Sequence, residues 1–343
     1  HTYLAMVCKL LAALYLSNAT SLTRDDMEDV LLGDYFEKHT GLVSFAEEDF
    51  FTWSLMEPTR QPGLDMAWRL CTELRTYDLS QVKPETLAGL YLQIEGRDVA
   101  PDVTARDAEN VLRNELRPQG NTRISLFDPA CGTGTYLCVA VQFVRESLEG
   151  EGMSPADTSS HILENVMGTD ANPLAVVVAR TSYLLALGDL LPSLRGEATV
   201  PIFVADGMRP PNVVQDDNER RRYVLEVGGG KEVLRIPEAL MANPEGLDYL
   251  LPFMKGKYGR SILGVLRDET SPSGNRAWGS FRQFLVTPAT SRKPFAVDEA
   301  DADVMMETQR VLVKLMLGGR DAPWFFILRN ELQAAFVRRR GLM

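Results

Sequence analysis

Residues 124–139 read ISLFDPACGTGTYLCV, and this stretch decides the fold. A short apolar run ends in Asp128, a turn containing Gly132 and Gly134 follows, and an apolar series comes after the turn. That order predicts a strand, a tight loop and a helix. Glycines in such a loop let the backbone approach a ligand that a Cβ atom would exclude. The stretch therefore indicates an α/β protein with a ligand at the strand end.

The chemistry of this loop favours a nucleotide-type ligand. A carboxylate at the strand end accepts hydrogen bonds from hydroxyl or ammonium groups, and the amides that open the following helix can meet a negative group. A Gly-x-Gly turn is common in α/β proteins, so the turn alone would be weak evidence. The residues around it make the signal more specific.

Two further apolar runs also end in an acid. The sequence VMGTD ends in Asp170, and a helix is expected to begin at Pro173. An acid at this point commonly holds a ribose diol, and the alternative is that Asp170 caps the helix. The sequence PIFVAD ends in Asp206, for which a plain turn with Gly207 is the alternative. Three acids after three successive strands favour a ligand role.

The segment Asp128-Pro129-Ala130-Cys131-Gly132-Thr133-Gly134, with Tyr136 and Leu137 behind it, closely resembles the S-adenosylmethionine loop of bacterial adenine-N6 DNA methyltransferases. Residues 78–93 resemble the segment just before the core of large restriction-modification and phage-defence methylases. The resemblance implies a Rossmann-like α/β domain and the cofactor S-adenosyl-L-methionine. It also implies methyl transfer to adenine N6 in DNA, within a restriction or phage-defence system.

The family places its ribose-binding acid where Asp170 stands, and an acid for the cofactor's adenine amine where Asp206 stands. The resemblance thus implies a set of cofactor-binding residues: Pro101, Asp128, Pro129, Ala130, Cys131, Gly132, Thr133, Gly134, Tyr136, Leu137, Asp170, Ala171, Asp206 and Gly207.

The chain departs from the family in two places. Relatives carry Gly-Glu-Phe-Tyr-Thr-Pro beside the methionine end of the cofactor, whereas residues 96–101 read GRDVAP. Val99 and Ala100 remove two hydroxyl donors, each worth on the order of 1 kcal/mol. The catalytic Asn-Pro-Pro-aromatic sequence does not occur. Residues 324–341 resemble the helix that precedes it, so we expect the catalytic residues beyond Met343. Together with the start at His1, this favours a piece of a longer protein.

Composition limits the partners. The net charge is -11 over 343 residues, which argues against this chain alone gripping DNA, because Lys and Arg supply most non-specific affinity. We expect double-stranded DNA to be contacted through regions outside this chain. The basic side chains between 260 and 293 fit phosphate contact and an ordinary solvated surface equally. Scattered histidines and cysteines indicate no metal site. No apolar run reaches bilayer length, so we expect a cytoplasmic protein without membrane contact.

Three other functions compete with this interpretation. A catalytically inactive, methyltransferase-like binding or scaffold protein is favoured by Val99, Ala100 and the missing catalytic sequence. A methyltransferase acting on something other than DNA would also lack that sequence. A nicotinamide dehydrogenase is disfavoured, because the turn lacks the full Gly-x-Gly-x-x-Gly spacing.

We expect a helical region over 1–120 and the cofactor-binding α/β core over 121–343, with an insertion around 211–300 and an incomplete C-terminal end. Aromatic residues near the start are expected in the core rather than stacked on bases: Phe45, Phe50, Phe51 and Trp53. Composition predicts loops over 150–158, 210–218 and 268–294. A glycine turn at 228–231 predicts a hairpin.

Overall fold

The computed structural model describes residues 1–17, 22–43, 45–46, 50–96, 103–116, 124–194, 196–206, 212–215, 220–227, 232–241, 244–254, 272–291, 293–317, 327–332 and 334–335. Val99, Ala100, Pro101, Gly207 and the hairpin turn lie outside these residues. The chain divides into two compact units, residues 1–208 and 209–340. The division thus falls near 208 and not near 120, where the sequence placed a boundary, because the N-terminal helices pack onto the helices of the first sheet.

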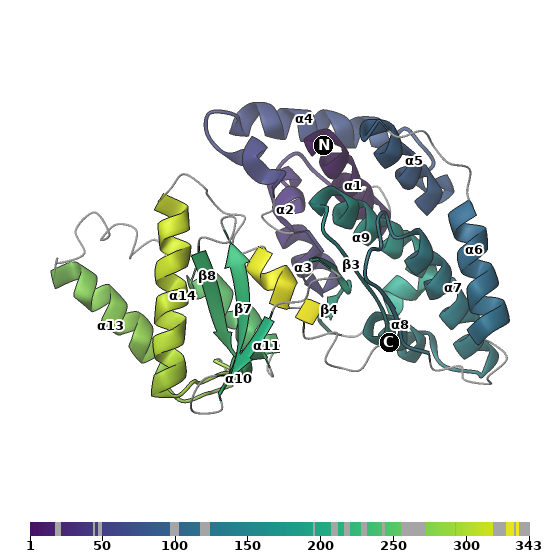
Figure 1. Cartoon of the computed structure of the whole chain (residues 1–343). Helices are drawn as coiled ribbons and strands as arrows, with labels where there is room; N and C mark the ends of the chain where they lie inside the picture. The colour runs from purple at the N-terminus through teal and green to yellow at the C-terminus, as the bar shows by residue number, and fades with distance from the viewer. Residues whose placement is uncertain are drawn as a thin grey trace. The chain divides into compact units, whose positions relative to one another are not determined.

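Unit 1 is mostly helical (Figure 1). Its helices are α1 Thr2–Leu16, α2 Met27–Leu32, α3 Asp34–Thr40, α4 Arg60–Leu74, α5 Pro84–Ile94, α6 Val103–Val111, α7 Thr135–Gly150, α8 Pro155–Asn165 and α9 Pro173–Leu187. Short turns of helix are η1 Thr52–Leu55, η2 Leu79–Gln81, η3 Leu112–Leu116 and η5 Gly188–Ser193. The strands are β1 Leu42–Val43, β2 Leu126–Asp128, β3 Val166–Asp170, β4 Ala198–Thr199 and β5 Ile202–Val204.

A three-stranded parallel sheet contains the strand that leads into the glycine turn. Its strand order is β2-β3-β5, with Asp128 opposite Gly168 and Asp170 opposite Val204. Because the strands are parallel, their carboxyl ends meet at one edge of the sheet. The predicted strand, loop and helix are confirmed as β2, the turn and α7. The chain is therefore of mixed α/β type, as expected.

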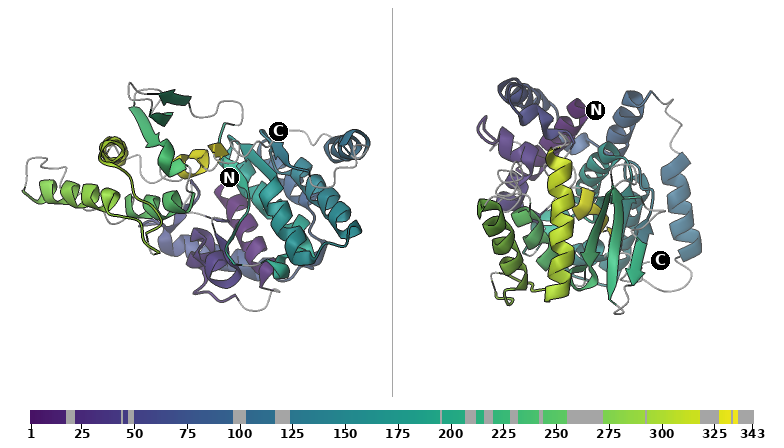
Figure 2. Two further views of the ribbon diagram at one scale, coloured as in Figure 1. Left: turned by 90° about the horizontal axis from the view of Figure 1, so that it is seen from below. Right: turned by 60° about the vertical axis from the view of Figure 1, so that its left-hand side comes forward.

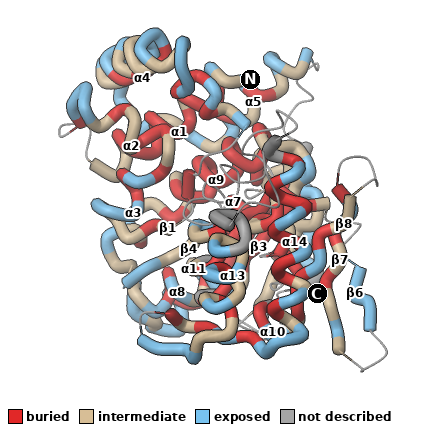
Figure 3. The backbone as a smooth tube through the Cα atoms, turned by 90° about the vertical axis from the view of Figure 1, so that its left-hand side faces the viewer, coloured by how far each residue is buried: buried red, intermediate tan, exposed pale blue. Residues whose placement is uncertain are grey.

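Helix α9 lies at the centre of unit 1. Its side chains are buried almost all round, as expected for an apolar helix in a core. It packs against α1, α5 and α7, and Figure 3 shows α1 and α9 as largely buried. Of the described helices, the span Pro173–Ser193 is the one long and apolar enough to cross a bilayer, and 72% of that window is buried in the structure. The expectation that no run reaches that length was wrong, and the burial marks a core helix.

Unit 2 has its own sheet and its own core. Strands β6 Asn212–Gln215, β7 Arg221–Val227 and β8 Glu232–Pro237 form an antiparallel sheet. Its helices are α10 Glu238–Met241, α11 Pro244–Phe253, α13 Pro272–Val286 and α14 Glu299–Leu317. Helix α14 lies along the sheet (Figure 2, right). Phe281, Leu285 and Leu312 are fully buried in the core between these elements.

Several expectations about connecting segments need correction. Helix α13 and strand β6 occupy segments that composition assigned to loops. Helix α8 begins at Pro155, inside the expected linker, because the Ser154 side chain accepts from the Asp157 amide and caps it. Strands β7 and β8 pair as the predicted hairpin.

The aromatic residues near the start of the chain differ in how far they are buried. Phe45 is buried, as expected of a core residue, but Phe50 is 40% exposed and Trp53 is 52% exposed. The Trp53 indole donates to the Thr2 hydroxyl at 2.9 Å, which holds it across the start of α1. The prediction of a buried cluster therefore holds for Phe45 and was wrong for Phe50 and Trp53.

Candidate functional site

The loop between β2 and α7 begins with a closed turn at Asp128. The Oδ1 atom of Asp128 accepts a hydrogen bond from the Ala130 amide at 3.0 Å. Gly132 and Gly134 then adopt positive φ angles of 54° and 84°, which side chains rarely tolerate. A Cβ at Gly134 would lie 3.1 Å from Ala179 of α9, whereas one at Gly132 would meet no heavy atom within 4 Å. Gly134 thus lets the loop pack on α9, and Gly132 keeps the space above the loop open.

Asp170 ties this loop to the neighbouring strand. Its Oδ2 accepts from the Gly132 amide at 2.9 Å, and its Oδ1 accepts from the Asn172 amide at 2.8 Å. An ionised carboxylate has about four acceptor positions, so two remain after these bonds. Asp170 can therefore hold the loop and still accept from two ligand hydroxyls.

Further bonds close the contact between the loop and β3. The Cys131 amide donates to the Thr169 carbonyl at 2.9 Å, and the Thr169 hydroxyl donates to the Pro129 carbonyl at 3.2 Å. A Cβ at Gly168 would lie 2.6 Å from the Cδ1 atom of Leu137 and 3.0 Å from the Cβ atom of Cys131, so a side chain there would force these neighbours to shift. Gly168 was not among the predicted site residues, although a glycine inside an apolar strand signals close packing.

Helix α9 is capped by Asn172, which bears on the alternative that Asp170 serves only as a helix cap. Its N-cap residue is Asn172, whose Oδ1 accepts from the Leu174 amide at 2.9 Å and from the Ala175 amide at 3.4 Å. The helix therefore needs no cap from Asp170. The exposed Ala171 lies between these two polar residues.

The pKa of the Asp128 carboxyl is raised, first because burial removes water from its charged form. The hydrogen bond from the Ala130 amide opposes this rise in pKa, and the negative charge of Asp170 adds to it. Two carboxylates near one another disfavour double ionisation. A cationic or hydrogen-bond-donating ligand between them would relieve that repulsion.

The start of α7 offers the opposite charge. Its N-cap residue is Gly134, and no side chain caps the helix. First-turn amides of a helix have no partner inside the helix, and the helix dipole adds positive potential there. The amides of Thr135 and Tyr136 therefore suit a carboxylate or another anionic group.

Asp206 follows β5 by two residues and is half-buried. Just before it, the Ala205 amide donates to the Asp170 carbonyl at 3.0 Å, which continues the pairing of β5 with β3. Asp128 and Asp170 thus end β2 and β3, and Asp206 lies just beyond the end of the neighbouring parallel strand β5.

An apolar pocket of about 360 Å³ opens beside Asp128. It is lined by α6, the start of η3, β2, the turn after β2 and the first half of α7: Ala108, Val111, Leu112, Leu126, Phe127, Asp128, Pro129, Ala130, Tyr136, Leu137 and Ala140. Mostly apolar walls with one carboxylate are typical of small-molecule sites. Ala108 and Val111 of α6 and Leu112 of η3 were not among the predicted site residues, although their i, i+3, i+4 spacing was the available signal.

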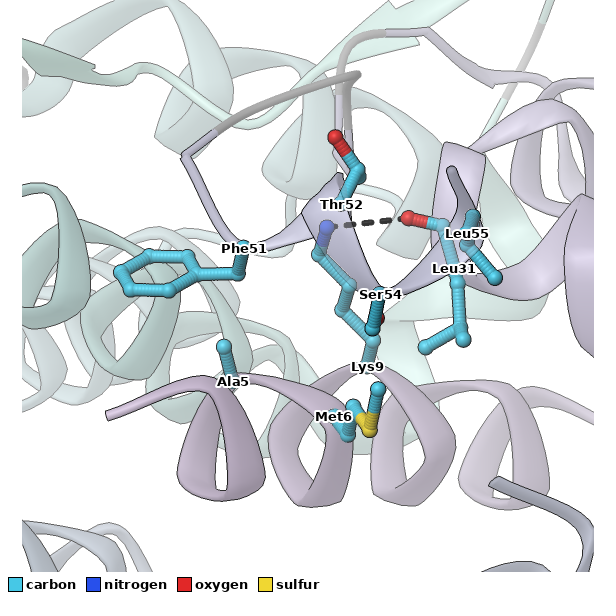
Figure 4. A pocket seen from close by; sticks show the side chains of 8 residues that line it. All are labelled: Ala5, Met6, Lys9, Leu31, Phe51, Thr52, Ser54 and Leu55. Atoms are coloured by element: carbon cyan, nitrogen blue, oxygen red, sulfur yellow. Dashed lines mark hydrogen bonds between the residues drawn. The ribbon is translucent and has the colours of Figure 1, made fainter. Parts of the chain in front are cut away.

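A second cavity lies in the N-terminal helical layer, lined by Lys9 of α1, Leu31 of α2 and residues around η1 (Figure 4). Its volume of about 10 Å³ suits no more than one water molecule. The buried Lys9 ammonium donates to the Leu31 carbonyl at 2.9 Å, drawn as the dashed line in Figure 4. This lysine therefore ties two helices together.

The basic segment of unit 2 favours an ordinary surface. Within its described residues, Arg282 pairs with Asp303 at 2.9 Å and also with Glu299. The buried Lys293 ammonium donates to the Thr287 and Phe295 carbonyls at 2.6 and 2.5 Å. These groups are already engaged within the protein. Arg260, Arg267 and Arg292 lie outside the described residues.

In the part of the chain that the structure describes, no group of three or more His, Cys, Asp or Glu could hold a metal ion. The cysteines are free and buried. Comparisons of the chain with protein-family models, with curated proteins and with solved structures find no match.

Proposed function

We propose that this chain is the cofactor-binding part of an S-adenosylmethionine-dependent methyltransferase with a Rossmann-like fold. The observation that carries the proposal is the bond from the Gly132 amide to Asp170, which joins a glycine loop to an acid on the adjacent parallel strand. Beside this junction lie three kinds of binding group. Asp170 keeps two acceptor positions for hydroxyl groups, Asp128 offers a carboxylate, and the first turn of α7 offers backbone amides that no side chain caps. These groups match the ribose and the amino-acid end of the cofactor.

Each part of the cofactor has a complementary group. Asp170 would accept from the ribose hydroxyls, Asp128 from the ammonium, and the amides of Thr135 and Tyr136 would bind the carboxylate. Asp206 would receive the adenine amine. When bound, the cofactor supplies an electrophilic methyl group, and the chain's own residues hold it in place.

The acceptor we propose is adenine N6 in double-stranded DNA, as part of a restriction or phage-defence system. This rests on the resemblance of residues 128–137 to the loop of that family. The DNA would be bound by protein regions other than this acidic chain. The alternative is a catalytically inactive, methyltransferase-like binding protein, favoured by Val99 and Ala100 in place of two hydroxyl-bearing residues.

Calorimetric titration with S-adenosyl-L-methionine tests the cofactor. We expect binding by the wild-type chain and a loss of affinity of roughly 10-fold or more in Asp170→Asn, because hydrogen bonds to a charged group are worth about 1.5–3 kcal/mol. The exposed Asp34→Asn serves as the matched control and should bind like the wild type. A folded wild-type chain that shows neither heat nor thermal stabilisation would refute the cofactor.

A labelled-methyl assay tests the reaction. One duplex carries adenine and a matched duplex carries N6-methyladenine at the same positions. Label in the first duplex alone would support adenine-N6 transfer. Cofactor binding without label in either duplex would show that this chain binds the cofactor without catalysing the transfer, as the missing Asn-Pro-Pro-aromatic sequence predicts.

A further inference from the structure

Tyr91 of α5 is connected to the candidate site through the side chain of Asn172, which was not among the predicted site residues. Its hydroxyl accepts a hydrogen bond from the Nδ2 atom of Asn172 at 3.0 Å. Tyr91 is 8% exposed, and α5 packs against α7 and α9, the helices on either side of the glycine loop. Tyr91 is therefore packed among these helices rather than exposed to solvent.

Asn172 has every polar group in use. Its side-chain oxygen caps α9, its backbone amide donates to Asp170, and its side-chain nitrogen donates to Tyr91. Within the described residues, Tyr91 is the acceptor for that nitrogen. Because both ends of the Asn172 side-chain amide are hydrogen-bonded, this amide has one orientation, with its oxygen toward the start of α9. Without the tyrosine hydroxyl, the half-buried amide nitrogen loses its partner, and the side chain gains freedom to rotate.

The same chain of bonds reaches the carboxylate that faces a ligand. The Oδ1 atom of Asp170 accepts from the backbone amide of Asn172 at 2.8 Å, and its Oδ2 atom accepts from the backbone amide of Gly132 at 2.9 Å. A shift of Asn172 would change the first of these bonds and with it the direction of the remaining acceptor positions. Bidentate acceptance from two neighbouring hydroxyls depends strongly on that direction.

We propose that Tyr91 is a positioning residue: through Asn172 it orients the Asp170 carboxylate and so sets the preference for a ligand that carries a vicinal diol. The identity of the ligand rests on the proposed function. The coupling from Tyr91 to the loop is a property of the chain itself.

The test compares Tyr91→Phe with the wild-type chain, using S-adenosyl-L-homocysteine and its 2′-deoxy analogue as titrants. The wild type should bind the ribose form roughly 10-fold more tightly, as expected for a hydrogen bond to a charged acceptor. Tyr91→Phe should reduce that ratio to about 2-fold, since the carboxylate is less well oriented. Tyr77→Phe, which alters a tyrosine that is 62% exposed, is the matched control and should keep the full ratio.

A second variant separates positioning from loss of stability. Asn172→Ser keeps a good helix cap but removes the amide that reaches Tyr91. It should lower the ratio as Tyr91→Phe does, and the double variant should lower it no further, because both changes break one relay. An unchanged ratio in Tyr91→Phe, or effects that multiply in the double variant, would overturn the proposal.

Hydrogen exchange of the ligand-free chain distinguishes this inference from the proposed function. The Gly132 amide donates to Asp170, whereas the Gly134 amide donates to the Cys131 carbonyl within the loop at 2.8 Å. Tyr91→Phe should speed exchange at Gly132 several-fold relative to Gly134. If the wild type binds neither titrant but exchange at Gly132 is faster in Tyr91→Phe, the positioning role of Tyr91 is supported and the proposed cofactor is refuted. If exchange at Gly132 is unchanged, the positioning role is wrong whatever binds.

Discussion

The Asp128 carboxylate has a raised pKa, chiefly because burial disfavours its charged form. Binding a cationic ammonium requires that charge. Protonation on lowering the pH should therefore weaken binding, and the loss should begin at a higher pH than for an ordinary aspartate with a pKa of about 3.9. We expect the affinity for S-adenosylmethionine to fall as the pH is lowered from neutral into the acid range, measured by calorimetric titration.

Asp128→Asn is the control for this pH dependence. The asparagine oxygen can still accept from the Ala130 amide, but the charge is gone. The variant should bind weakly at every pH, with a flat profile. Because a raised carboxyl pKa means that ionisation opposes folding above that pKa, the neutral side chain should also increase the free energy of unfolding at neutral pH. A wild-type affinity that does not change with pH would exclude Asp128 from ammonium binding.

At the scale of elements, Gly134 lets the loop after β2 pack closely on α9, whereas Gly132 leaves space above that loop for a ligand. Gly134→Ala should lower the free energy of unfolding by about 2–4 kcal/mol, because left-handed strain adds to a clash with Ala179. Gly132→Ala carries the strain alone and should cost about 1 kcal/mol. Denaturant unfolding measures both changes.

Gly132→Ala and Gly134→Ala should also differ in their affinity for S-adenosylmethionine. At Gly132 the new methyl group would project into open space above the loop, where the ligand is proposed to approach. Gly132→Ala should therefore reduce the affinity for S-adenosylmethionine more than its small effect on stability suggests. Equal losses of affinity and stability in the two variants would show that the space above Gly132 is not used.

At the scale of the whole molecule, the candidate site and its named partners belong to unit 1, while unit 2 has a separate core. Phe281→Ala removes a fully buried ring from unit 2 and should cost about 3–5 kcal/mol. Leu148→Ala removes a fully buried side chain from α7 of unit 1 and should cost about 2–5 kcal/mol. Scanning calorimetry should show that each change lowers a different unfolding transition.

The affinity for S-adenosylmethionine then reports which unit carries the site. Phe281→Ala should leave it unchanged at temperatures where unit 1 is folded, and Leu148→Ala should weaken it. A loss of affinity in Phe281→Ala without any change in the unit 1 transition would contradict a site contained in residues 1–208.

Local patterns predicted much of the framework. Helices α1, α7 and α9 and the three acid-ended strands follow from apolar spacing and from glycine and proline positions, which act within a few residues. The same reasoning failed for α13. Its Ser, Pro and Gly content favours a loop, but Phe281 and Leu285 fall at helical spacing and are buried in the core of unit 2.

The sequence by itself determined the acid at the end of β2, the glycine turn and the helix behind it, because each depends on neighbouring residues. Only the tertiary structure decided which groups Asp170 and Tyr91 contact. Gly132 and Asp170 are 38 positions apart, and Tyr91 and Asn172 are 81 apart. Such pairs meet because parallel strands bring their carboxyl ends to one edge and because α5 packs on α9, and no local pattern encodes either contact.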